Sequence, residues 1–495
     1  MTLYGIAAIA AAEPDRLAIV CDDVRLPYGE LDRRINRFAH LLADRGVSHG
    51  DRVAVLLRNR PEVFVVWNAV GRLGGIPVPV SYRFTPTEIR YVVGDSNSVV
   101  FVHDRDTDAS AVEGLDDLRD SVDVDALSLE DEVSTPPTEE FLGSHVIGMA
   151  YTSGTTGRPK GIVRSLPTPT REMAPNPLAM FWGFGPDDVH LLCGPAYHTA
   201  PGIYSMLHLT LGATVVVMQP FNAEQCLDLI ETERVTTSHM VPANFIRILD
   251  ADWQSRDLSS VRKILHAAAP CPVAVKRRIF EVFPPETVWE YYGMSEGMGT
   301  VISPEEWLQK PGSVGKAFPG LDVKIVGDDG APMPAGEIGT ICVSAIPGYR
   351  FGYHNAPEKT AAAWDGDYFT VGDMGWLDDD GFLFIADRRT DLVISGGVNI
   401  YPAEVEQAIA EHPDVVDVAV FGVPDERMGQ IVHAVVELRA GAQCTADELV
   451  ATLRGSLADF KVPRSVEFVD ELPREPNGKV RKTQLRQAYL RHPSR

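Results

Sequence analysis

A stretch rich in glycine and hydroxyl side chains, from Tyr151 to Gly161 (YTSGTTGRPKG), has the composition of an anion-binding loop. Its glycines allow backbone amides to approach a ligand closely and to adopt positive φ. Successive N–H groups in such a loop form an anion site, to which hydroxyls add uncharged donors. The stretch therefore predicts a site for a polyanion, most simply the β- and γ-phosphates of a nucleotide. The alternative is a surface turn. The residues expected to bind are Thr152, Ser153, Gly154, Thr155, Thr156, Gly157 and Lys160.

The stretch is not the phosphate loop of the P-loop NTPases, which requires G-x4-G-K-[ST]. Gly154 and Gly157 are too close together, Pro159 precedes the lysine, and a glycine follows it. Proline would also stop a helix from running through Lys160. The sequence indicates a phosphate loop of another class.

The stretch resembles the signature loop of the adenylate-forming superfamily, which comprises acyl-CoA synthetases, firefly luciferase and the adenylation domains of peptide synthetases. Further matches recur at the expected intervals as far as the C-terminus, so the resemblance covers nearly the whole chain, and it is greatest to a bacterial acyl-CoA synthetase. In such enzymes Lys160 and Thr155 would act on the phosphates, with Thr155 also near the metal.

The segment Tyr291 to Glu296 (YYGMSE) resembles the Y-G-x-T-E motif of that superfamily. Glu296 would be the Mg²⁺ ligand, since a hard cation bound to phosphates prefers carboxylate oxygen. Ser295 replaces the usual threonine and keeps the hydroxyl. The resemblance implies that Tyr291 or Tyr292 stacks near the adenine, with Gly293 also among the nucleotide-binding residues; the alternative is a helix-terminal glutamate and an ordinary core tyrosine.

Two further matches concern the nucleotide. Asp373 (in FTVGD) corresponds to the carboxylate that holds both ribose hydroxyls, and one carboxylate can accept two such hydrogen bonds. Arg388 corresponds to an arginine that contacts the nucleotide. The small residues Ala267, Ala268 and Ala269 would leave room for a flat adenine ring. His266 stands where the family has serine, either altering the acyl side of the pocket or serving as a hydrogen-bonded core histidine.

The segment Pro195 to Gly202 resembles the P-x-x-H element beside the carboxylate pocket, with His198 as a gating or orienting residue. Domains that select α-amino acids carry an aspartate in this element, and none is present here, which disfavours an amino-acid substrate. Residues expected to line the acid pocket are His198, Met206, His239, Met240, Met294, Met298 and Gly299. Their largely apolar character favours a hydrophobic or aromatic acid, as in fatty acid or aromatic acid metabolism.

The last match is the stretch around Lys479 (LPREPNGKVRK), which corresponds to the catalytic lysine motif. Lys479 would stabilise charge in the transition state. The resemblance also implies a C-terminal domain that rotates about a hinge, where Thr390 replaces the usual aspartate or lysine. Gly396 and Gly397 would line the channel for the pantetheine arm of coenzyme A.

The composition fits a soluble globular protein of 495 residues, with 45% hydrophobic and 23% charged residues. A net charge of −24 argues against nucleic acid or an anionic membrane as a partner. Six cysteines without a C-x-x-C pair suggest neither a disulfide framework nor a metal framework. The N-terminus lacks a basic signal region and no long apolar stretch occurs, so we expect a cytoplasmic protein without a membrane span.

The hydrophobic pattern predicts an α/β fold with parallel sheets, because amphipathic helices alternate with apolar strands. The acidic residues 103–140 read as a solvated surface region, and His145 to Tyr151 as a strand that delivers the loop at the C-terminal end of an open sheet. We expect a large ATP- and acid-binding domain (1–387) that includes a small β-barrel-like subdomain, a hinge (388–391), and a small mobile α+β domain (392–495). Helices are expected at 29–46, 61–73, 223–234, 402–411 and 446–458, and strands at 51–57, 74–80, 211–218, 261–266, 415–422 and 431–439.

The leading hypothesis is ATP-dependent activation of a carboxylic acid to an acyl-adenylate, with release of pyrophosphate and transfer of the acyl group to coenzyme A. It requires ATP, Mg²⁺ and coenzyme A. One alternative acceptor is a carrier-protein thiol or another nucleophile. A hypothesis of a different class is an inactive nucleotide-binding sensor. A luciferase-like oxygenase has no positive support in the sequence.

Overall fold

The computed structural model describes residues 5–128, 133–136, 148–152, 159–165, 176–346, 348–475 and 478–491. The chain divides into two compact units. The first unit comprises residues 1–239, 256–263 and 346–362, and the second comprises 240–255, 264–345 and 363–495. Among the helices in these ranges, none has the length and apolar character needed to span a bilayer.

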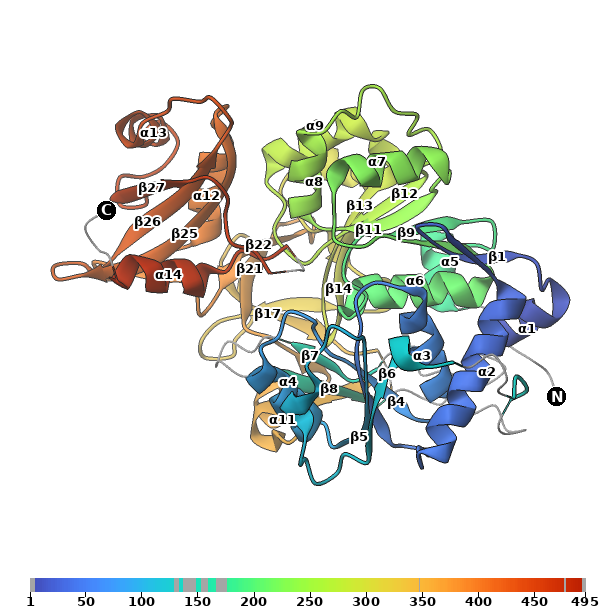
Figure 1. Cartoon of the computed structure of the whole chain (residues 1–495). Coiled ribbons are helices and arrows are strands. Elements are labelled where there is room, and N and C mark those ends of the chain that lie inside the picture. Colours follow the sequence, from blue (N-terminus) through green and yellow to red (C-terminus); the bar gives the residue numbers. More distant parts are fainter. Residues whose placement is uncertain are drawn as a thin grey trace. The chain divides into compact units, whose positions relative to one another are not determined.

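The first unit contains a parallel sheet of four strands in the order β4-β3-β5-β6 (Figure 1). Its strands are β3 (Arg52–Leu56), β4 (Ile76–Pro79), β5 (Ser98–His103) and β6 (Asp120–Asp123). They are rich in buried valine, as expected of parallel strands covered on both faces. The connecting helices are α3 (Pro61–Arg72) and α4 (Pro86–Asp95), and α2 (Tyr28–Asp44), which precedes β3, packs against α3.

A second group of strands in the first unit runs in the order β11-β9-β10-β1-β2, parallel except for β2. These strands are β1 (Leu17–Cys21), β2 (Val24–Pro27), β9 (Val189–Leu192), β10 (Thr214–Val217) and β11 (Thr237–Met240). The helices are α1 (Ile6–Ala12), α5 (Pro177–Trp182), α6 (Thr199–Leu211) and α7 (Ala223–Thr232). Gly212 ends α6 with a φ of 92°, which favours glycine.

The strand before the phosphate loop differs from its prediction. It is β7 (Ala150–Thr152), which pairs antiparallel with β8 (Lys160–Ser165). The third strand of this small sheet is β18 (Arg350–Tyr353), which is followed by α11 (Pro357–Ala363). The loop therefore belongs to an antiparallel hairpin and not to the end of an open parallel sheet. Residues 137–147, which include the start of the predicted strand, lie outside the described ranges.

The acidic region 103–140 is also more ordered than predicted, where it is described. It contributes β6 and the 3-10 turns at Ala109–Val112 and Val124–Ala126. Val112 and Val122 are buried, whereas their polar neighbours are mostly exposed. Two isolated apolar side chains gave too weak a pattern to predict an edge strand.

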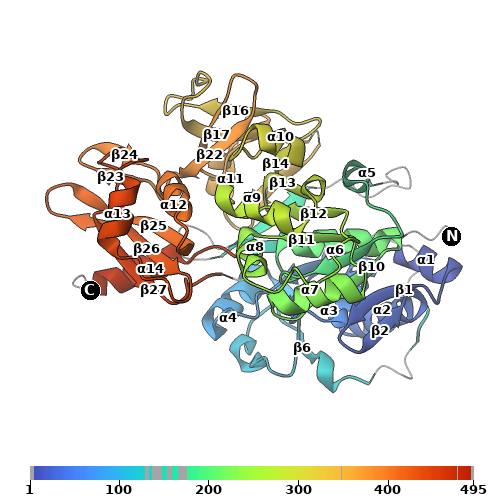
Figure 2. The same ribbon diagram turned by 90° about the horizontal axis from the view of Figure 1, so that it is seen from above.

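In the second unit, β12 (Lys263–His266) runs parallel to β13 (Val288–Met294), which pairs antiparallel with β14 (Gly297–Ile302). The short β15 (Lys316–Ala317) pairs with β14. The helices are α8 (Pro242–Leu249), α9 (Val273–Val282) and α10 (Pro304–Gln309), with a 3-10 turn at Pro285–Thr287. Figure 2 shows α8 and α9 side by side next to these strands, in agreement with the packing contacts between the two helices.

The β-rich region of the second unit is a sheet of six strands in which each pairing is antiparallel. Its strands are β16 (Val323–Val326), β17 (Gly339–Ser344), β19 (Trp364–Asp365), β20 (Tyr368–Phe369), β21 (Asp373–Leu377) and β22 (Leu383–Arg388). Hairpin β21–β22 places Asp373 directly opposite Arg388.

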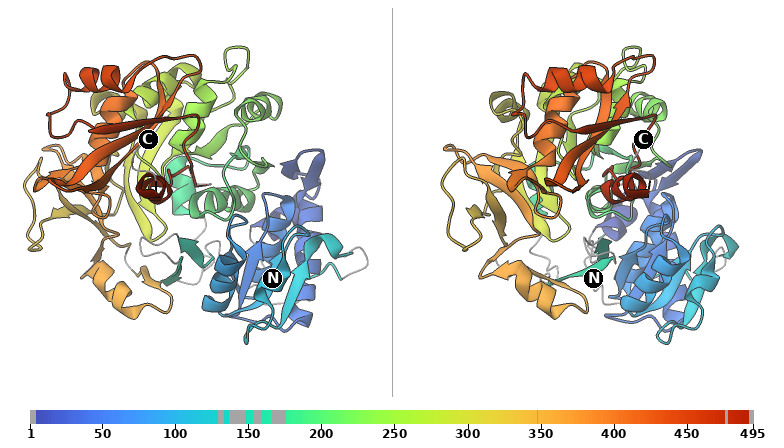
Figure 3. Two further views of the ribbon diagram at one scale, coloured as in Figure 1. Left: turned by 60° about the vertical axis from the view of Figure 1, so that its left-hand side comes forward. Right: turned by 90° about the vertical axis from the view of Figure 1, so that its left-hand side faces the viewer.

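The C-terminal part forms its own sheet, β24-β23-β26-β25, with β27 parallel to β26. The strands are β23 (Val393–Ser395), β24 (Val398–Ile400), β25 (Val415–Asp425), β26 (Gly429–Leu438) and β27 (Ser465–Val469). The helices are α12 (Pro402–Ala410), α13 (Ala446–Leu453) and α14 (Lys482–Arg491). Figure 3 shows the dark red α14 beside the orange strands, and α12 and α14 both contact β25. A separate apolar core joins this sheet to α12 and α13.

The prediction of a mixed α/β fold with parallel sheets and a separate C-terminal domain is thus confirmed. The predicted helices and strands occur close to their expected positions, although α13 ends at Leu453 and not at 458. The domain boundaries at 387 and 392 stay a prediction.

Candidate active site

The predicted phosphate loop is carried by the β7–β8 hairpin. Thr152 and Lys160 are opposite each other in this pair, so both ends of the loop are fixed. Tyr151 anchors the hairpin, since its hydroxyl donates to Asp95 Oδ2 at 2.7 Å. The five predicted ligands Ser153 to Gly157 lie outside the described residues. The structure therefore describes the two strands that carry the loop, but not the loop residues themselves.

Close packing explains why Gly161 follows the lysine. A Cβ atom at this position would lie 2.3 Å from the Met149 Cε and 2.9 Å from the Tyr151 ring, closer than atoms can approach. The Lys160 ammonium lies 5.3 Å from the centre of the Tyr353 ring, within the range of a cation–π contact. The lysine is thus held beside the strand that neighbours the hairpin.

His198 is the N-cap residue of α6, and its side chain lines a cavity of about 470 Å³, part of it open to solvent. Most of the other lining residues are apolar, and they include Trp67, Pro77, Ile203 and Met206. Of the residues predicted to line an acid pocket, His198 and Met206 lie here, whereas His239 and Met240 are buried in β11.

Sequence reasoning missed several of the lining residues, among them Trp67 and Arg164. Trp67 is one of many apolar residues of α3, and nothing in its sequence context distinguishes it from the others. Arg164 follows the glycine-rich stretch on β8, where Ile162 is buried and Val163 exposed; because both are apolar, the sequence carries no signal of which face each residue takes. Arg164 introduces a positive charge into a largely apolar lining.

A chain of buried side chains holds α6 against the sheet. His208 Nδ1 donates to the Tyr204 carbonyl at 2.7 Å, so its Nε2 must accept from the Thr237 hydroxyl at 3.0 Å. The Thr237 oxygen in turn accepts from His190 Nδ1 at 3.0 Å. Burial lowers the pKa of His208 to about 4 and that of His190 well below its usual value. Both rings are therefore neutral, each as its Nδ1–H tautomer.

In the second unit, Asp373 joins two other predicted nucleotide-binding residues. The Tyr292 hydroxyl donates to Asp373 Oδ2 at 2.7 Å, and Arg388 Nε lies 3.2 Å from Asp373 Oδ1. Burial and the nearby Asp373 charge raise the pKa of Tyr292, which keeps the phenol protonated as a donor. Gly299 makes room for the tyrosine, because a Cβ there would lie 2.7 Å from the ring.

Lys479 lies in the electrostatic field of the same cluster. Burial and the positive charge of Arg388 lower the pKa of Lys479, while the carboxylates of Asp373 and Glu296 oppose this effect. Glu296 is buried at the tip of the β13–β14 hairpin. Lys479 is thus brought near groups 106 and 183 residues before it in the sequence (479 − 373 and 479 − 296). A carboxylate at such a hairpin tip is a fitting Mg²⁺ ligand.

The other predicted residues of the Y-G-x-T-E match lie on this hairpin. Tyr291 is 7% exposed and so largely unavailable for stacking, whereas Gly293 and Ser295 are partly exposed. A Cβ at Gly293 would lie 3.1 Å from the Tyr291 ring. The hairpin is therefore closely packed up to Glu296.

The predicted adenine slot contains a strained residue. Ala268 has a φ of 76°, a conformation that costs an alanine about 1–2 kcal/mol. Its neighbour Ala267 is buried, whereas Ala268 is exposed and Ala269 half-buried. Strain of this kind occurs where surrounding structure imposes it, often at binding sites.

A buried ion pair lies below this slot. Lys276 Nζ is 2.6 Å from Glu290 Oε2, and both side chains are almost fully buried. His266, at the end of β12, lies 3.5 Å from the same carboxylate and edge-on to Phe245. This environment favours the alternative of a core histidine over a role in acyl binding.

Gly396 and Gly397 form the turn between β23 and β24, with φ values of 58° and 81°. Gly396 N donates to the Met428 carbonyl at 2.8 Å, and a Cβ on Gly396 would lie 2.6 Å from Met428 Cε. Both glycines are exposed, as a turn that lines a channel must be before a ligand covers it.

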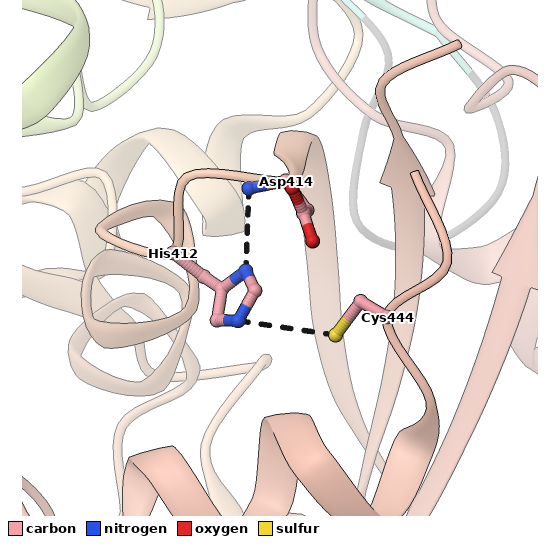
Figure 4. Close-up of side chains that lie close together, drawn as sticks. All are labelled: His412, Asp414 and Cys444. Carbon is pink, nitrogen blue, oxygen red and sulfur yellow. Dashed lines mark hydrogen bonds between the residues drawn. The ribbon is translucent and has the colours of Figure 1, made fainter. Parts of the chain in front are cut away.

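A further cluster, His412, Asp414 and Cys444, lies in the C-terminal domain (Figure 4). Cys444 Sγ is 3.9 Å from His412 Nε2, and the Asp414 amide donates to His412 Nδ1 at 3.3 Å. Because His412 Nδ1 accepts the hydrogen bond from the Asp414 amide, a neutral His412 carries its proton on Nε2, the ring atom nearest to the Cys444 sulfur. Burial and the acidic neighbours also raise the pKa of Cys444. The three residues are partly exposed, and these two contacts account for their proximity, so we interpret the cluster as structural.

Models of two parts of one enzyme family match this sequence. The model described as "AMP-binding enzyme" matches residues 6–352, and "AMP-binding enzyme C-terminal domain" matches residues 404–479. The chain belongs to the AMP-binding enzyme family. The resemblance inferred from the sequence motifs is therefore confirmed.

Relatives of this AMP-binding enzyme cover almost its full length. It is 32% identical to the fatty acid–[acyl-carrier-protein] ligase ScoC of Streptomyces coeruleorubidus, over 97% of this chain and 95% of that protein. It is 35% identical to a feruloyl-CoA synthase of an Amycolatopsis species, over 97% of both. The structure of o-succinylbenzoate coenzyme A synthetase (MenE) from Bacillus subtilis with ATP and magnesium has a TM-score of 0.83 and 30% identity, over 97% of this chain and 98% of that one. The chain is an acyl-activating ligase of the AMP-forming type.

Proposed function

We propose that this enzyme activates a carboxylic acid with ATP and Mg²⁺ and transfers the acyl group to coenzyme A. In the first step a carboxylate oxygen attacks the α-phosphorus of ATP. The bond from that phosphorus to the oxygen bridging to the β-phosphorus breaks, and pyrophosphate leaves. In the second step the thiol of coenzyme A attacks the acyl carbon, the bond to AMP breaks, and the thiol proton passes to solvent. The structure of the relative MenE in complex with ATP and magnesium supports the choice of ATP and Mg²⁺ as reactants.

The observation that carries the proposal is the cluster of Lys479, Asp373, Arg388 and Glu296 in the second unit. The reactants of the first step are both anions, so the barrier arises from repulsion and developing phosphoryl charge. A cation in a partly dry site lowers that barrier more than it would in water. Asp373 supplies the acceptor for a ribose, and Glu296 would hold Mg²⁺, which neutralises phosphate charge when bound.

The decisive experiment is acid-dependent exchange of pyrophosphate into ATP with a panel of carboxylic acids. We expect exchange with hydrophobic or aromatic acids, because the cavity beside His198 is lined mainly by apolar residues. Short polar acids and α-amino acids should give little exchange. Absence of exchange with every acid would contradict the proposal.

Replacement of Lys479 tests the role of the cation. Lys479→Ala should lower the rate of pyrophosphate exchange by about 10²–10³-fold, since a cation directed at the transition state is lost. The KM for the acid should change little, because the side chain does not contribute to the apolar cavity. A rate within a factor of two of the wild type would exclude Lys479 as a catalytic residue.

A carrier-protein thiol is the second candidate acceptor, supported by the full-length similarity to an acyl-carrier-protein ligase. The two acceptors are distinguished by AMP release in the presence of coenzyme A or of a phosphopantetheinylated carrier protein. Stimulation by coenzyme A alone would support the first candidate, and stimulation by the carrier protein alone would support the second.

A further inference from the structure

Lys479 lies near the end of a short segment, from Arg474 to Val480 and here called the turn, whose described residues are joined by main-chain hydrogen bonds. Gly478 N donates to the Glu475 carbonyl at 2.9 Å, and Glu475 N donates to the Lys479 carbonyl at 2.7 Å. Arg474 and Val480 form a bridge at the base of the turn. These bonds hold Glu475, Gly478 and Lys479 close to one another, but they do not fix the place of these residues on the domain.

Arg474 connects the turn to the C-terminal sheet. Its Nη2 donates to the Asp417 carboxylate on β25, and its Nη1 donates to the Gly478 carbonyl. The two charged side chains are mostly buried, with 18% of Arg474 and 12% of Asp417 exposed. Gly478 directly precedes Lys479, so one planar group joins a strand of the sheet to the backbone of the lysine.

On its other side, the turn packs against the start of α8. Gly478 has a φ of 83°, and a Cβ there would lie 2.7 Å from Val241 Cγ2 and 3.3 Å from Ala243 Cβ. The turn is thus held between Arg474 and α8. A shift of Gly478 away from α8 would move the Lys479 backbone by a similar distance.

We propose that Arg474, oriented by Asp417, positions the backbone that carries Lys479 and so acts as a positioning residue in acyl-adenylate formation. This inference depends on the proposed function, in which Lys479 stabilises the charge of the transition state. A guanidinium donates to two acceptors in fixed directions, which the point charge of lysine cannot reproduce. Removal of Arg474 leaves the Asp417 carboxylate without its cation and the Gly478 carbonyl without this donor, so the turn loses its tie to β25.

The test compares Arg474→Met with Lys479→Ala and with the double variant, measured by acid-dependent pyrophosphate exchange. Arg474→Met should lower kcat by about 10–100-fold, the loss typical of a catalytic group displaced by about 1 Å. The KM for ATP should stay near the wild-type value. In the Lys479→Ala background, the same replacement should cause no further loss.

A matched control is Arg464→Met, which removes another ion-paired arginine of the same domain. Arg464 Nη2 lies 2.8 Å from the exposed Asp459, away from the turn. This variant should retain wild-type exchange.

Arg474→Lys, which keeps the charge beside Asp417, should retain folding and still lose at least fivefold in kcat.

A second measurement separates positioning from a general structural effect. Transfer of the acyl group from chemically prepared acyl-adenylate to coenzyme A should proceed at the wild-type rate in Arg474→Met. Equal losses in both steps, or losses that add in the double variant, would overturn the inference. If the wild-type enzyme shows no acid-dependent exchange, the proposed function is refuted. If the wild type is active and Arg474→Met is equally active, only the positioning role of Arg474 is refuted.

Discussion

At the scale of single residues, the backbone of Ala268 in the predicted adenine slot is strained. Its φ of 76° is unfavourable for a residue with a Cβ. Ala268→Gly should therefore stabilise the protein by up to about 1 kcal/mol, the strain relieved being partly offset by the greater freedom of glycine in the unfolded chain. Urea denaturation followed by circular dichroism measures the difference.

The control for this prediction is Ala267→Gly. The φ of Ala267 lies outside the left-handed region, so glycine there only adds freedom to the unfolded chain and should cost about 0.5–1 kcal/mol. Equal effects of the two replacements would show that the backbone at residue 268 is not strained.

The motifs named single residues that the fold brings together, and the roles assigned to them stay predictions. Asp373, Arg388 and Tyr292 lie together, and Lys479 shares their electrostatic environment. Arg164 and Trp67 were missed, because a cavity lining combines side chains from separate elements and leaves no spacing in the sequence. Ala268 could not be foreseen to be strained, since positive φ is a property of the folded loop and alanine carries no signal for it.

At the scale of elements, the histidines of β9, α6 and β11 make the first unit sensitive to acid. Burial lowers the pKa of His208 and of His239 to about 4, from an ordinary value of 6.5. Below about pH 6.5 the unfolded chain takes up protons that the folded chain does not. The free energy of unfolding should therefore fall as the pH decreases from 6.5 to 4, by on the order of 3 kcal/mol for each histidine.

Urea denaturation at pH 7, 6 and 5 measures this loss, with His208→Gln as the comparison. The variant lacks one of the titrating groups, so its stability should depend less steeply on pH in this range. Identical slopes for the two proteins would contradict the assignment of a buried neutral His208.

Helices and buried strands were predictable because their apolar residues repeat with the period of the element. The hairpin β7–β8 was not, because both its strands are short and the loop between them dominates the local composition. Whether a strand pairs in a parallel or an antiparallel sense depends on its partners. The partner of β7 is β8, and β8 also pairs with β18, almost 200 residues later in the sequence. Sequence periodicity carries no information on that choice.

At the scale of the whole molecule, two ion pairs join the C-terminal sheet domain to the region of α8 within the second unit. Arg247 lies 2.7 Å from Glu471, and Arg439 lies 3.2 Å from Asp250. Each is partly exposed and should contribute no more than about 1 kcal/mol. Arg247→Gln with Arg439→Gln should loosen this contact and speed tryptic cleavage after Arg388 by up to about tenfold.

Cleavage is followed by electrophoresis and by mass spectrometry of the fragments. The double variant Arg33→Gln with Arg34→Gln, which removes two ion pairs of Glu30 within α2, serves as the control and should leave the rate at residue 388 unchanged. An unchanged rate in the Arg247 and Arg439 variant would show that other contacts hold the domain.

The hydrogen bond from Tyr292 to Asp373 has a consequence for how nucleotide occupancy could be followed without a label. A vicinal diol that takes the Asp373 carboxylate competes directly with the phenol for one of its oxygens. The near-ultraviolet absorption of a tyrosine depends on whether its hydroxyl donates to a charged acceptor. Difference absorption spectra of the wild type, compared with Tyr292→Phe, would then record occupancy of the predicted ribose site as an intrinsic optical signal.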